Sequence, residues 1–437
     1  MDSEKLFIII CGLLSKLKQS WCIFKKNELR RKIIKLYSLY IIVKRNENIK
    51  KRRKYWMRPI FSLERRFQQG ASENLVKEML IEDTEKYMDY FRMAPQLFDA
   101  LLALVGPFLV KEYVVREPIS PDTRLQITLR YLASGDSMKS LSYAFRIAHN
   151  TISKIISETC EIIWNCLKDS VFLTDNEENW KSVADEFQQL WNFPNCIGAI
   201  DGKHVQIQAP PNSGSMYYNY KGHHSINLLG ISDANYCFTI VDIGAEGRQS
   251  DGGVFRNSEI GKRFEANSFK LPIPRQIEIN GPELPYVLVA DEAFPLSMHI
   301  MRPYPRSGKL DIGKKIFNYR LSRARRVVEN AFGILVARWR IYRRSIIANV
   351  RNARKIIQAT VTLHNFIIKN EEKLTGNKLY LHLTPDDART SHGIRNIPLC
   401  RSRGNKNAVA VREAYSTYFQ NAGALSYQWE KALQNDF

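Results

Sequence analysis

Three acidic residues stand at points of the sequence where a carboxylate can do chemistry. Asp201 ends the apolar run CIGAID, Asp291 ends the run VLVAD, and Glu329 lies among apolar residues in RRVVENAF. Side chains at the ends of buried strands project into an exposed crevice of an α/β sheet. Converging carboxylates supply the hard oxygen ligands that Mg²⁺ and Mn²⁺ prefer, and two such ions can activate an attacking hydroxyl and stabilise the leaving oxygen of a phosphodiester.

Each of these acids also has an ordinary structural explanation. Asp201 can begin a turn before Gly202, Asp291 can cap the segment that follows it, and Glu329 can pair with Arg325 four residues earlier. Taken singly, each residue favours this structural explanation. Only the order of the three acids along the chain favours chemistry.

The segments that carry the acids predict a mixed α/β sheet. Three β-rich runs precede a helix, a fourth strand and a long helix, at 196–208, 225–235, 237–247, 250–264, 285–294 and 318–341. The acids fall on the first strand, at the end of the fourth strand and on the later helix. There are 89 residues between Asp201 and Asp291 and 37 between Asp291 and Glu329. This order resembles an RNase H-like nuclease core with the spacing of a DDE transposase.

The part of the chain before this sheet is predicted to be helical. Apolar residues recur with helical spacing over 75–167. Within this range, a first helix from Met138 is followed by a break near Ala148 and by a second helix that Asn150 or Thr151 would cap, which is helix-turn-helix spacing. Two helices joined by a short turn also occur in any bundle. If the segment reads DNA, the second helix would present Thr151, Ser153 and Lys154.

The charge distribution predicts a polyanionic partner. The chain has 65 Lys and Arg against 44 Asp and Glu, a net charge of +21. Residues 1–66 and 302–355 are strongly basic, whereas the rest of the chain is net acidic, so we expect nucleic acid on two surfaces. Arginine supplies forked donors that suit phosphate oxygens. We expect DNA-backbone contacts from the arginines on and after the Glu329 helix, namely Arg320, Arg323, Arg325, Arg326, Arg338, Arg340, Arg343 and Arg344.

The N-terminal segment and the cysteines restrict the location of the protein. The apolar stretch KLFIIICGLL is too short to span a bilayer, so we expect no membrane contact. The basic run Lys50–Lys54 is typical of a nuclear-import signal or a phosphate-binding arm, and equally of a solvated basic helix end. The seven cysteines are scattered and form no C-x-x-C pair, which indicates a reducing compartment and excludes a zinc knuckle.

Two lower-ranked features lie near the first acid in the sequence. Asp251 follows Ser250, and capping of a helix by this pair is the simpler explanation for it. His223 and His224, beside Lys221, are candidates for contact with a phosphate, but a histidine pair before a strand is more often structural. Neither spacing resembles a zinc site.

Four motifs in order resemble the PIF/Harbinger-type DDE endonuclease domain and the host nucleases derived from it: CIGAIDGKHVQIQ with the residues that follow it, VLVADEAFPL, FNYRLSRARRVVENAFGILVARWRI and TLHNFII. The resemblance covers residues 194–369, and the preceding helical half resembles the DNA-binding half of that family. It implies a metal-dependent nuclease or transposase, with Asp201, Asp291 and Glu329 as catalytic residues and as ligands of Mg²⁺ or Mn²⁺. It also implies a separate Myb-like DNA-binding partner, and Asp251 resembles an aspartate that recurs in that family.

These observations predict four segments: a basic leader or arm that is partly disordered, an all-α helix-turn-helix-like DNA-binding bundle, an RNase H-like α/β DDE domain, and a helix-and-loop tail, at 1–66, 67–180, 190–370 and 371–437. We expect a nuclease that cleaves DNA in the nucleus, with the cytoplasm as a second location. Two alternatives remain open: a domesticated DNA-binding or adaptor protein that does not cut, and cleavage of RNA by the same core.

Overall fold

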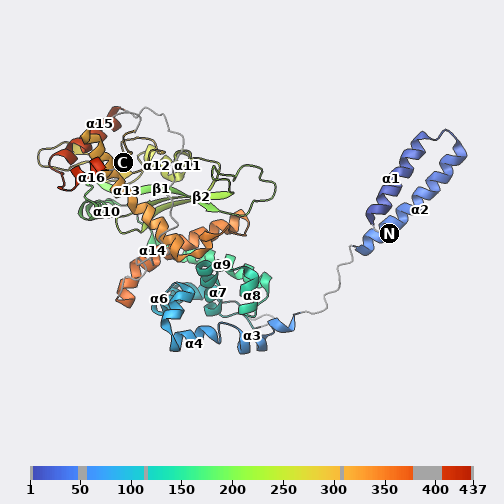
Figure 1. The fold of residues 1–437 in the computed structure, drawn as a ribbon. Helices are drawn as coiled ribbons and strands as arrows, with labels where there is room; N and C mark the ends of the chain where they lie inside the picture. The colour runs from blue at the N-terminus through green and yellow to red at the C-terminus, as the bar shows by residue number, and fades with distance from the viewer. Residues whose placement is uncertain (1–2, 48–56, 113–116, 306–309, 377–405, 435–437) are drawn as a thin grey trace. The chain divides into compact units, whose positions relative to one another are not determined.

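A computed structural model describes residues 3–47, 57–112, 117–305, 310–376 and 406–434 (Figure 1). The chain forms two compact units, residues 1–59 and 60–437, and each is described by itself. The basic run Lys50–Lys54 lies outside the described residues.

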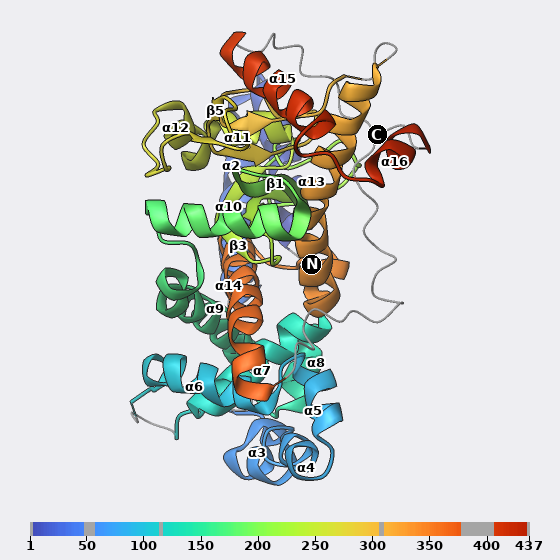
Figure 2. The same ribbon diagram turned by 90° about the vertical axis from the view of Figure 1, so that its left-hand side faces the viewer.

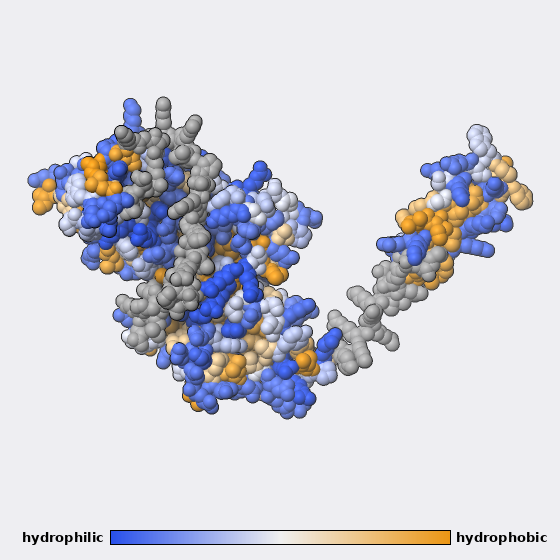
Figure 3. Space-filling view, viewed as in Figure 1, coloured by the Kyte–Doolittle hydropathy of each residue, from blue (hydrophilic) through white to orange (hydrophobic). Residues whose placement is uncertain are grey.

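The first unit is a helical hairpin. Its helices α1 (Ser3–Gln19) and α2 (Ile23–Glu47) pack through buried Leu6 and Ile10 and through the rings of Phe7 and Tyr40, whose centroids are 6.0 Å apart. Many apolar side chains of the hairpin are nevertheless exposed (Figure 3), including Ile8, Trp21, Phe24, Ile34 and Ile42. Within the described chain, no helix combines the length and the apolar character needed to cross a bilayer.

The second unit contains a mixed five-stranded sheet in the order β3-β2-β1-β6-β7. The strands β1, β2 and β3 are antiparallel neighbours, whereas β6 and β7 run parallel to β1. The strands are β1 (Cys196–Gln206), β2 (Ser225–Ser232), β3 (Phe238–Glu246), β6 (Val287–Val289) and β7 (Ile300–Met301). This confirms the mixed α/β class. The sequence did not predict β7, because two residues are too few to show alternation.

In the described part of the chain, a separate two-stranded hairpin and further helices accompany this sheet (Figures 1 and 2). The hairpin is formed by β4 (Arg275–Gln276) and β5 (Glu283–Leu284). The helices are α10 (Glu177–Trp191), α11 (Asp251–Asn257), α12 (Glu259–Glu265), α13 (Ile312–Arg338), α14 (Val350–Thr375), α15 (Lys406–Gln420) and α16 (Gln428–Gln434).

Two of these helices differ from the prediction because of their caps. The helix after Ser250 is divided into α11 and α12, since Ser258 ends the first and its hydroxyl accepts from Gly261 N at 3.0 Å to begin the second. The long helix α13 begins six residues before the predicted start, because the Asp311 carboxylate caps it by accepting from Lys314 N at 2.8 Å. Helix α13 packs on β1, β2 and β6, so it can carry Glu329 toward the sheet.

Further helices precede the sheet in the chain: α3 (Leu63–Gln69), α4 (Leu75–Glu82), α5 (Thr84–Phe91), α6 (Pro95–Leu109), α7 (Pro121–Ser134), α8 (Met138–Ala144) and α9 (His149–Val171). The last two are the predicted helix pair, but the predicted cap is wrong. Helix α9 begins at His149 with Ala148 as its N-cap, so Asn150 and Thr151 already lie in its first turn. The break is held by the Ser142 hydroxyl, which donates to Ile147 O at 2.6 Å.

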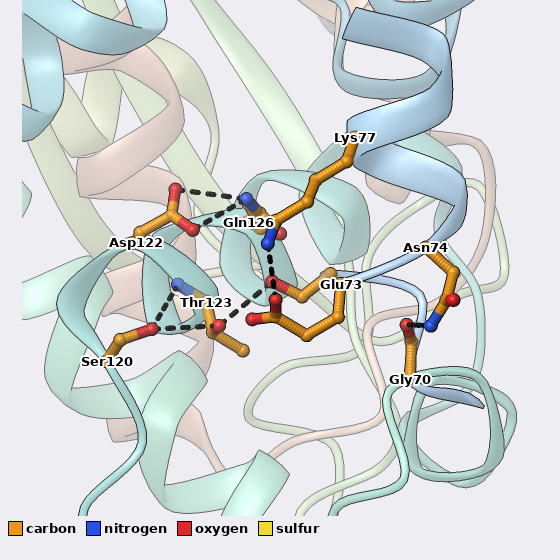
Figure 4. Close-up of polar contacts among 9 residues, drawn as sticks. Gly70, Glu73, Asn74, Lys77, Ser120, Asp122, Thr123 and Gln126 are labelled. Carbon is orange, nitrogen blue, oxygen red and sulfur yellow. Dashed lines mark hydrogen bonds and ion pairs between the residues drawn. The ribbon is translucent and has the colours of Figure 1, made fainter. Parts of the chain in front are cut away.

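The start of α7 is fixed by hydroxyl groups (Figure 4). The Ser120 hydroxyl accepts from Thr123 N at 3.3 Å and caps the helix. The Thr123 hydroxyl lies 2.9 Å from that of Ser72, which joins the segment before α4 to α7. Gln126 donates to both oxygens of Asp122, at 3.0 and 2.9 Å. The bond from Thr123 N satisfies one of the backbone donors that a helix start leaves free, and the other bonds join side chains.

Helix α14 joins the sheet to the preceding helices. It packs along α9, as Figure 2 shows, and also contacts β2 and β3. The buried Asn365 amide donates to Phe238 O and Val171 O at 2.7 and 3.1 Å and accepts from Phe238 N at 2.9 Å. The adjacent His364 bonds Tyr236 O through Nε2 at 2.9 Å. We call His364 and Asn365 with these backbone partners the α14 clamp.

Candidate active site

Asp201 and Asp291 lie side by side because of the register of the parallel strands. Ala199 on β1 pairs with Val289 on β6, and each aspartate lies two residues further along its strand direction. Asp201 lies within β1, not at its end as the sequence suggested, whereas Asp291 lies two residues after the end of β6. The acids are close enough for the charge of Asp291 to act on Asp201, at the point where β6 has ended and β1 continues.

Helix α13 adds the third predicted acid together with a cation. Glu329 Oε1 lies 2.6 Å from the guanidinium of Arg325, one helical turn earlier. Burial lowers the pKa of Arg325, but the negative charges of Glu329, Asp201 and Asp291 more than offset this effect, so its pKa lies above its ordinary value. Arg325 is thus the common neighbour of all three predicted acids.

The carboxyl pair is electrostatically strained. Burial raises the pKa of Asp201, and the charge of Asp291 raises it further. Burial likewise raises the pKa of Asp291, although Arg325 and a hydrogen bond from Ala293 N at 2.9 Å oppose the change. Two like charges that share a desolvated site cannot both ionise without a nearby cation. Arg325 supplies one positive charge there.

The structural and the chemical explanations of the acids are therefore compatible. Asp201 accepts from Gly202 N at 2.9 Å, Asp291 forms its turn with Ala293, and Glu329 pairs with Arg325, all as ordinary local contacts. The same fold also gathers the acids around one guanidinium. Local spacing alone does not distinguish these explanations, because a side chain can make a local contact and still face the site.

A divalent cation suits this site in its chemistry, although the ligand set is incomplete. Two adjacent carboxylates with raised pKa values are hard oxygen donors that a cation would stabilise in the ionised form. Among the residues that the structure describes, however, no three His, Cys, Asp or Glu side chains are grouped so that they could hold a metal. The Arg325 ion pair engages Glu329 instead.

A fourth acid of this site is Asp251, which resembles a recurrent aspartate of the family but for which the sequence favoured a capping role. Ser250 is the cap of α11, whereas Asp251 lies inside the helix start and is 1% exposed. Its Oδ1 accepts from Asn227 Nδ2 at 2.9 Å, but its buried Oδ2 has no hydrogen-bond partner. A Cβ atom at Gly202 would lie 2.2 Å from Oδ1, so the glycine allows Asp251 to approach β1 directly beside Asp201. We call Asp201, Asp251, Asp291, Arg325 and Glu329 the acid cluster.

The sequence contained one weak signal for Asp251 and none for Asn227. A glycine that follows an acid in a strand can mark a close approach of another group. Which group approaches Gly202 depends on a helix that begins about fifty residues later. Sequence spacing does not determine that contact.

The arginines of α13 have different surroundings, and one prediction is wrong. Arg320 is 2% exposed, donates to Gly423 O at 2.9 Å and to Gln428 at 2.8 Å, and also donates to Asn192 O. It therefore fastens α13 to the C-terminal segment and is not available to DNA phosphate. Its position on a helix suggested a basic face, but the C-terminal residues cover it.

The other predicted DNA contacts vary in exposure. Arg323 is partly buried and donates to Asn192 and Tyr427, whereas Arg326 is exposed. Arg338 and Arg340 are partly buried and have partners within the chain. Arg343 and Arg344 are exposed in the 3₁₀ helix η2 (Arg340–Arg343) and just after it. On α9, Lys154 is exposed, while Thr151 and Ser153 are partly buried.

Comparison with known proteins identifies relatives. Residues 200–365 match the family described as DDE superfamily endonuclease. Protein ALP1-like of Arabidopsis thaliana is 28% identical over 310 residues, which cover 67% of this chain and 72% of that protein. HARBI1 of Bos taurus and of Homo sapiens, named as a candidate nuclease, is 25% identical over 310 residues, covering 69% of this chain and 83% of each relative. No solved structure matches the chain.

The match begins one residue before Asp201 and ends at Asn365, so it includes the acid cluster and reaches the α14 clamp. The alignments with these relatives extend over 310 residues, more than the family match alone covers. The chain carries a DDE superfamily endonuclease domain and is similar to the Harbinger transposase-derived proteins ALP1-like and HARBI1.

Proposed function

We propose that this protein is a divalent-metal-dependent endonuclease that cleaves DNA phosphodiester bonds at the acid cluster, within an RNase H-like domain. The observation that carries the proposal is the convergence of Asp201, Asp291 and Glu329 on the charge of Arg325. The four acids of the cluster lie on four separate segments, and their desolvation would be unfavourable without a cation. The match to DDE superfamily endonucleases supports the same chemistry.

In this proposal, Asp201 and Asp291 would be the principal metal ligands, and Glu329 would complete the ligand set once it is released from its ion pair with Arg325. A bound Mg²⁺ or Mn²⁺ pair would supply activation of the attacking hydroxyl and stabilisation of the leaving oxygen. Arg325 stabilises the acids while no other cation is near, and its guanidinium can then pair with a DNA phosphate. Asp251 holds Asn227 and adds negative charge next to Asp201.

The test is cleavage of supercoiled plasmid by the full chain. We expect nicking with Mg²⁺ or Mn²⁺, no nicking with EDTA, and loss of nicking in Asp291→Asn. Glu292→Gln is the matched control, because Glu292 is the exposed neighbour of Asp291. Equal nicking by wild type and Asp291→Asn would show that the activity comes from a contaminant and would contradict the proposal.

A DNA-binding or adaptor protein that does not cut is the second candidate. One relative, 24% identical over 290 residues, is named Antagonist of Like Heterochromatin Protein 1. This name describes an antagonist of another protein and does not mention a nuclease. DNA retention without metal-dependent nicking in the plasmid assay would favour this candidate. Competition between duplex DNA and an RNA–DNA hybrid in the same assay separates DNA cleavage from RNA cleavage.

The remaining parts of the proposal concern the surfaces and the location. DNA would contact the exposed Lys154 and Arg326, with the helical half and the sheet domain both engaged. Nuclear localisation would depend on Lys50–Lys54, and replacement of these residues by alanine in a tagged full chain tests it. A Myb-like partner is proposed from the family alone, and co-purification with the full chain tests that part.

A further inference from the structure

The loop between β1 and β2 presents large side chains to solvent next to the acid cluster. This segment, residues 208–224, is called the tyrosine loop here. Met216, Tyr218 and Tyr220 are 46%, 49% and 54% exposed, although they lie within five residues of one another. Exposed apolar groups gathered at one place often mark a binding surface.

The loop is held in a defined conformation. Asn219 is buried, and its Oδ1 accepts from Lys221 N at 3.0 Å and from His223 N at 3.1 Å. Its Nδ2 donates to Ser225 Oγ at 2.8 Å, at the start of β2. Gly222 has a φ of 79°, which favours glycine at the turn. The two exposed tyrosines flank this anchored asparagine, so little ordering is needed when they bind a partner.

Tyr220 lies close to the acids. Its ring centroid is 5.6 Å from that of His204, which by strand alternation shares its face of β1 with Gly202, the residue that Asp251 approaches. Burial and the charges of Asp251, Asp201 and Asp291 all raise the pKa of Tyr220, which indicates the same proximity. The tyrosine hydroxyl therefore stays protonated at neutral pH, and the ring remains an uncharged aromatic surface.

Positive charge accompanies the aromatic surface. Lys221 Nζ lies 5.6 Å from the centroid of the Tyr220 ring. Lys203 is not part of this surface, because it is half-buried on the other face of β1 and its Nζ lies 5.9 Å from the centroid of the Phe332 ring on α13. Aromatic rings beside a lysine are the combination that binds single-stranded nucleic acid, because bases stack on the rings and phosphates contact the cation.

We propose that Tyr218 and Tyr220 form a stacking platform for an unpaired DNA base beside the scissile phosphate, with Lys221 contacting the backbone. The inference rests on the proposed nuclease function of the acid cluster and deepens it. It assigns the substrate as DNA that is unpaired, or becomes unpaired, next to the cleavage point. A fully paired duplex keeps its bases stacked inside the helix and offers the platform no aromatic face.

The test is binding of two duplexes by the full chain carrying Asp201→Asn. One duplex contains a single unpaired 2-aminopurine, and the other has the same sequence fully paired. We expect quenching of 2-aminopurine on binding and tighter binding of the first duplex. Tyr218→Leu with Tyr220→Leu should abolish the quenching and reduce the preference about tenfold, since stacking on one aromatic side chain contributes on the order of a factor of ten.

Two controls separate stacking from other effects. Phenylalanine at both positions should retain the quenching, because the rings remain. Tyr143→Leu on α8 removes another exposed tyrosine and should leave the preference unchanged. The platform would be overturned if the double leucine variant kept the wild-type quenching and the wild-type preference for the duplex with the unpaired base. It would also be overturned if wild type and all variants showed the same preference for that duplex.

The outcomes also separate this inference from the function on which it rests. The Asp201→Asn background makes the binding readout independent of cleavage. Loss of preference in the double leucine variant, with no metal-dependent nicking by wild type, would support the platform and reject the nuclease. Nicking by wild type with an unchanged preference in the double leucine variant would support the nuclease and reject the platform.

Discussion

The second unit contains two clusters of polar residues, the α14 clamp and the acid cluster, which differ in whether their buried polar atoms have hydrogen-bond partners. In the α14 clamp, the Asn365 amide oxygen accepts one hydrogen bond and its nitrogen donates two, and all three partners are backbone groups of other elements. In the acid cluster, like charges lie together and a buried oxygen of Asp251 has no partner. Satisfied buried polar groups stabilise a fold, whereas unsatisfied ones are unfavourable and gather at functional sites. The clamp therefore indicates structure, and the acid cluster indicates function.

The comparison is tested most strongly by Asp201→Asn. We expect metal-dependent cleavage to fall by at least about a thousandfold, or about 4 kcal/mol in the activation barrier. The same change should raise the free energy of unfolding by about 1 kcal/mol, because it removes one of two repelling buried carboxylates. Plasmid nicking and urea unfolding measure the two effects. A large loss of stability would place Asp201 with the structural groups.

The clamp is tested by Asn365→Ala. The substitution leaves Phe238 N, Phe238 O and Val171 O buried without partners, so we expect the free energy of unfolding to fall by about 3 kcal/mol. Asn370→Ala on the same helix is the control, since that side chain donates only to Phe366 O at 2.7 Å. Urea unfolding should show a much smaller loss in the free energy of unfolding for Asn370→Ala. Equal losses in the two variants would mean that the clamp has no special role.

His364 should make the clamp sensitive to acid. Burial lowers the pKa of His364 to about 4, against an ordinary value of 6.5. Below pH 6.5 the unfolded chain therefore binds a proton that the folded chain does not, and stability falls as the pH decreases until about pH 4. We expect this residue to reduce the free energy of unfolding by about 2 kcal/mol between pH 7 and pH 5.

Urea unfolding of wild type and His364→Gln at both pH values measures this contribution. The glutamine amide can still donate to Tyr236 O, but it does not titrate. The free energy of unfolding of wild type should therefore fall more than that of His364→Gln between pH 7 and pH 5. A difference that stays constant would show that His364 titrates alike in the folded and unfolded chains.

The smallest expected effect is that of Asp251→Asn. The amide keeps an oxygen for Asn227 and removes a buried negative charge beside Asp201, so we expect stability to rise by about 1 kcal/mol. Thermal unfolding measures the change, and Ser250→Ala at the neighbouring cap, which should lower stability, is the control. A loss of stability in Asp251→Asn would mean that the acid cluster is held together like the clamp.

Much of the fold was predictable because the signals are local. Apolar alternation identified β1, β2 and β3, and the helical apolar pattern of α13 located Glu329 on a helix. The short strand β7, the cap at Ala148 and the division at Ser258 were missed or misplaced, since each depends on one or two residues. The buried role of Arg320 was also missed, because the residues that cover it lie about a hundred positions later.

The sequence by itself determined that Asp201 and Asp291 each close an apolar run, because this pattern is local. It also determined the strongly basic segments and carried the resemblance to a family. Only the tertiary structure decided that Asp201 lies within β1 rather than at its end and that Asp291 follows β6 beside it, that Arg325 stands among three acids, and that Asp251 reaches Gly202. These contacts join segments that are tens of residues apart, and they follow from the packing of whole elements, which no short stretch of sequence contains.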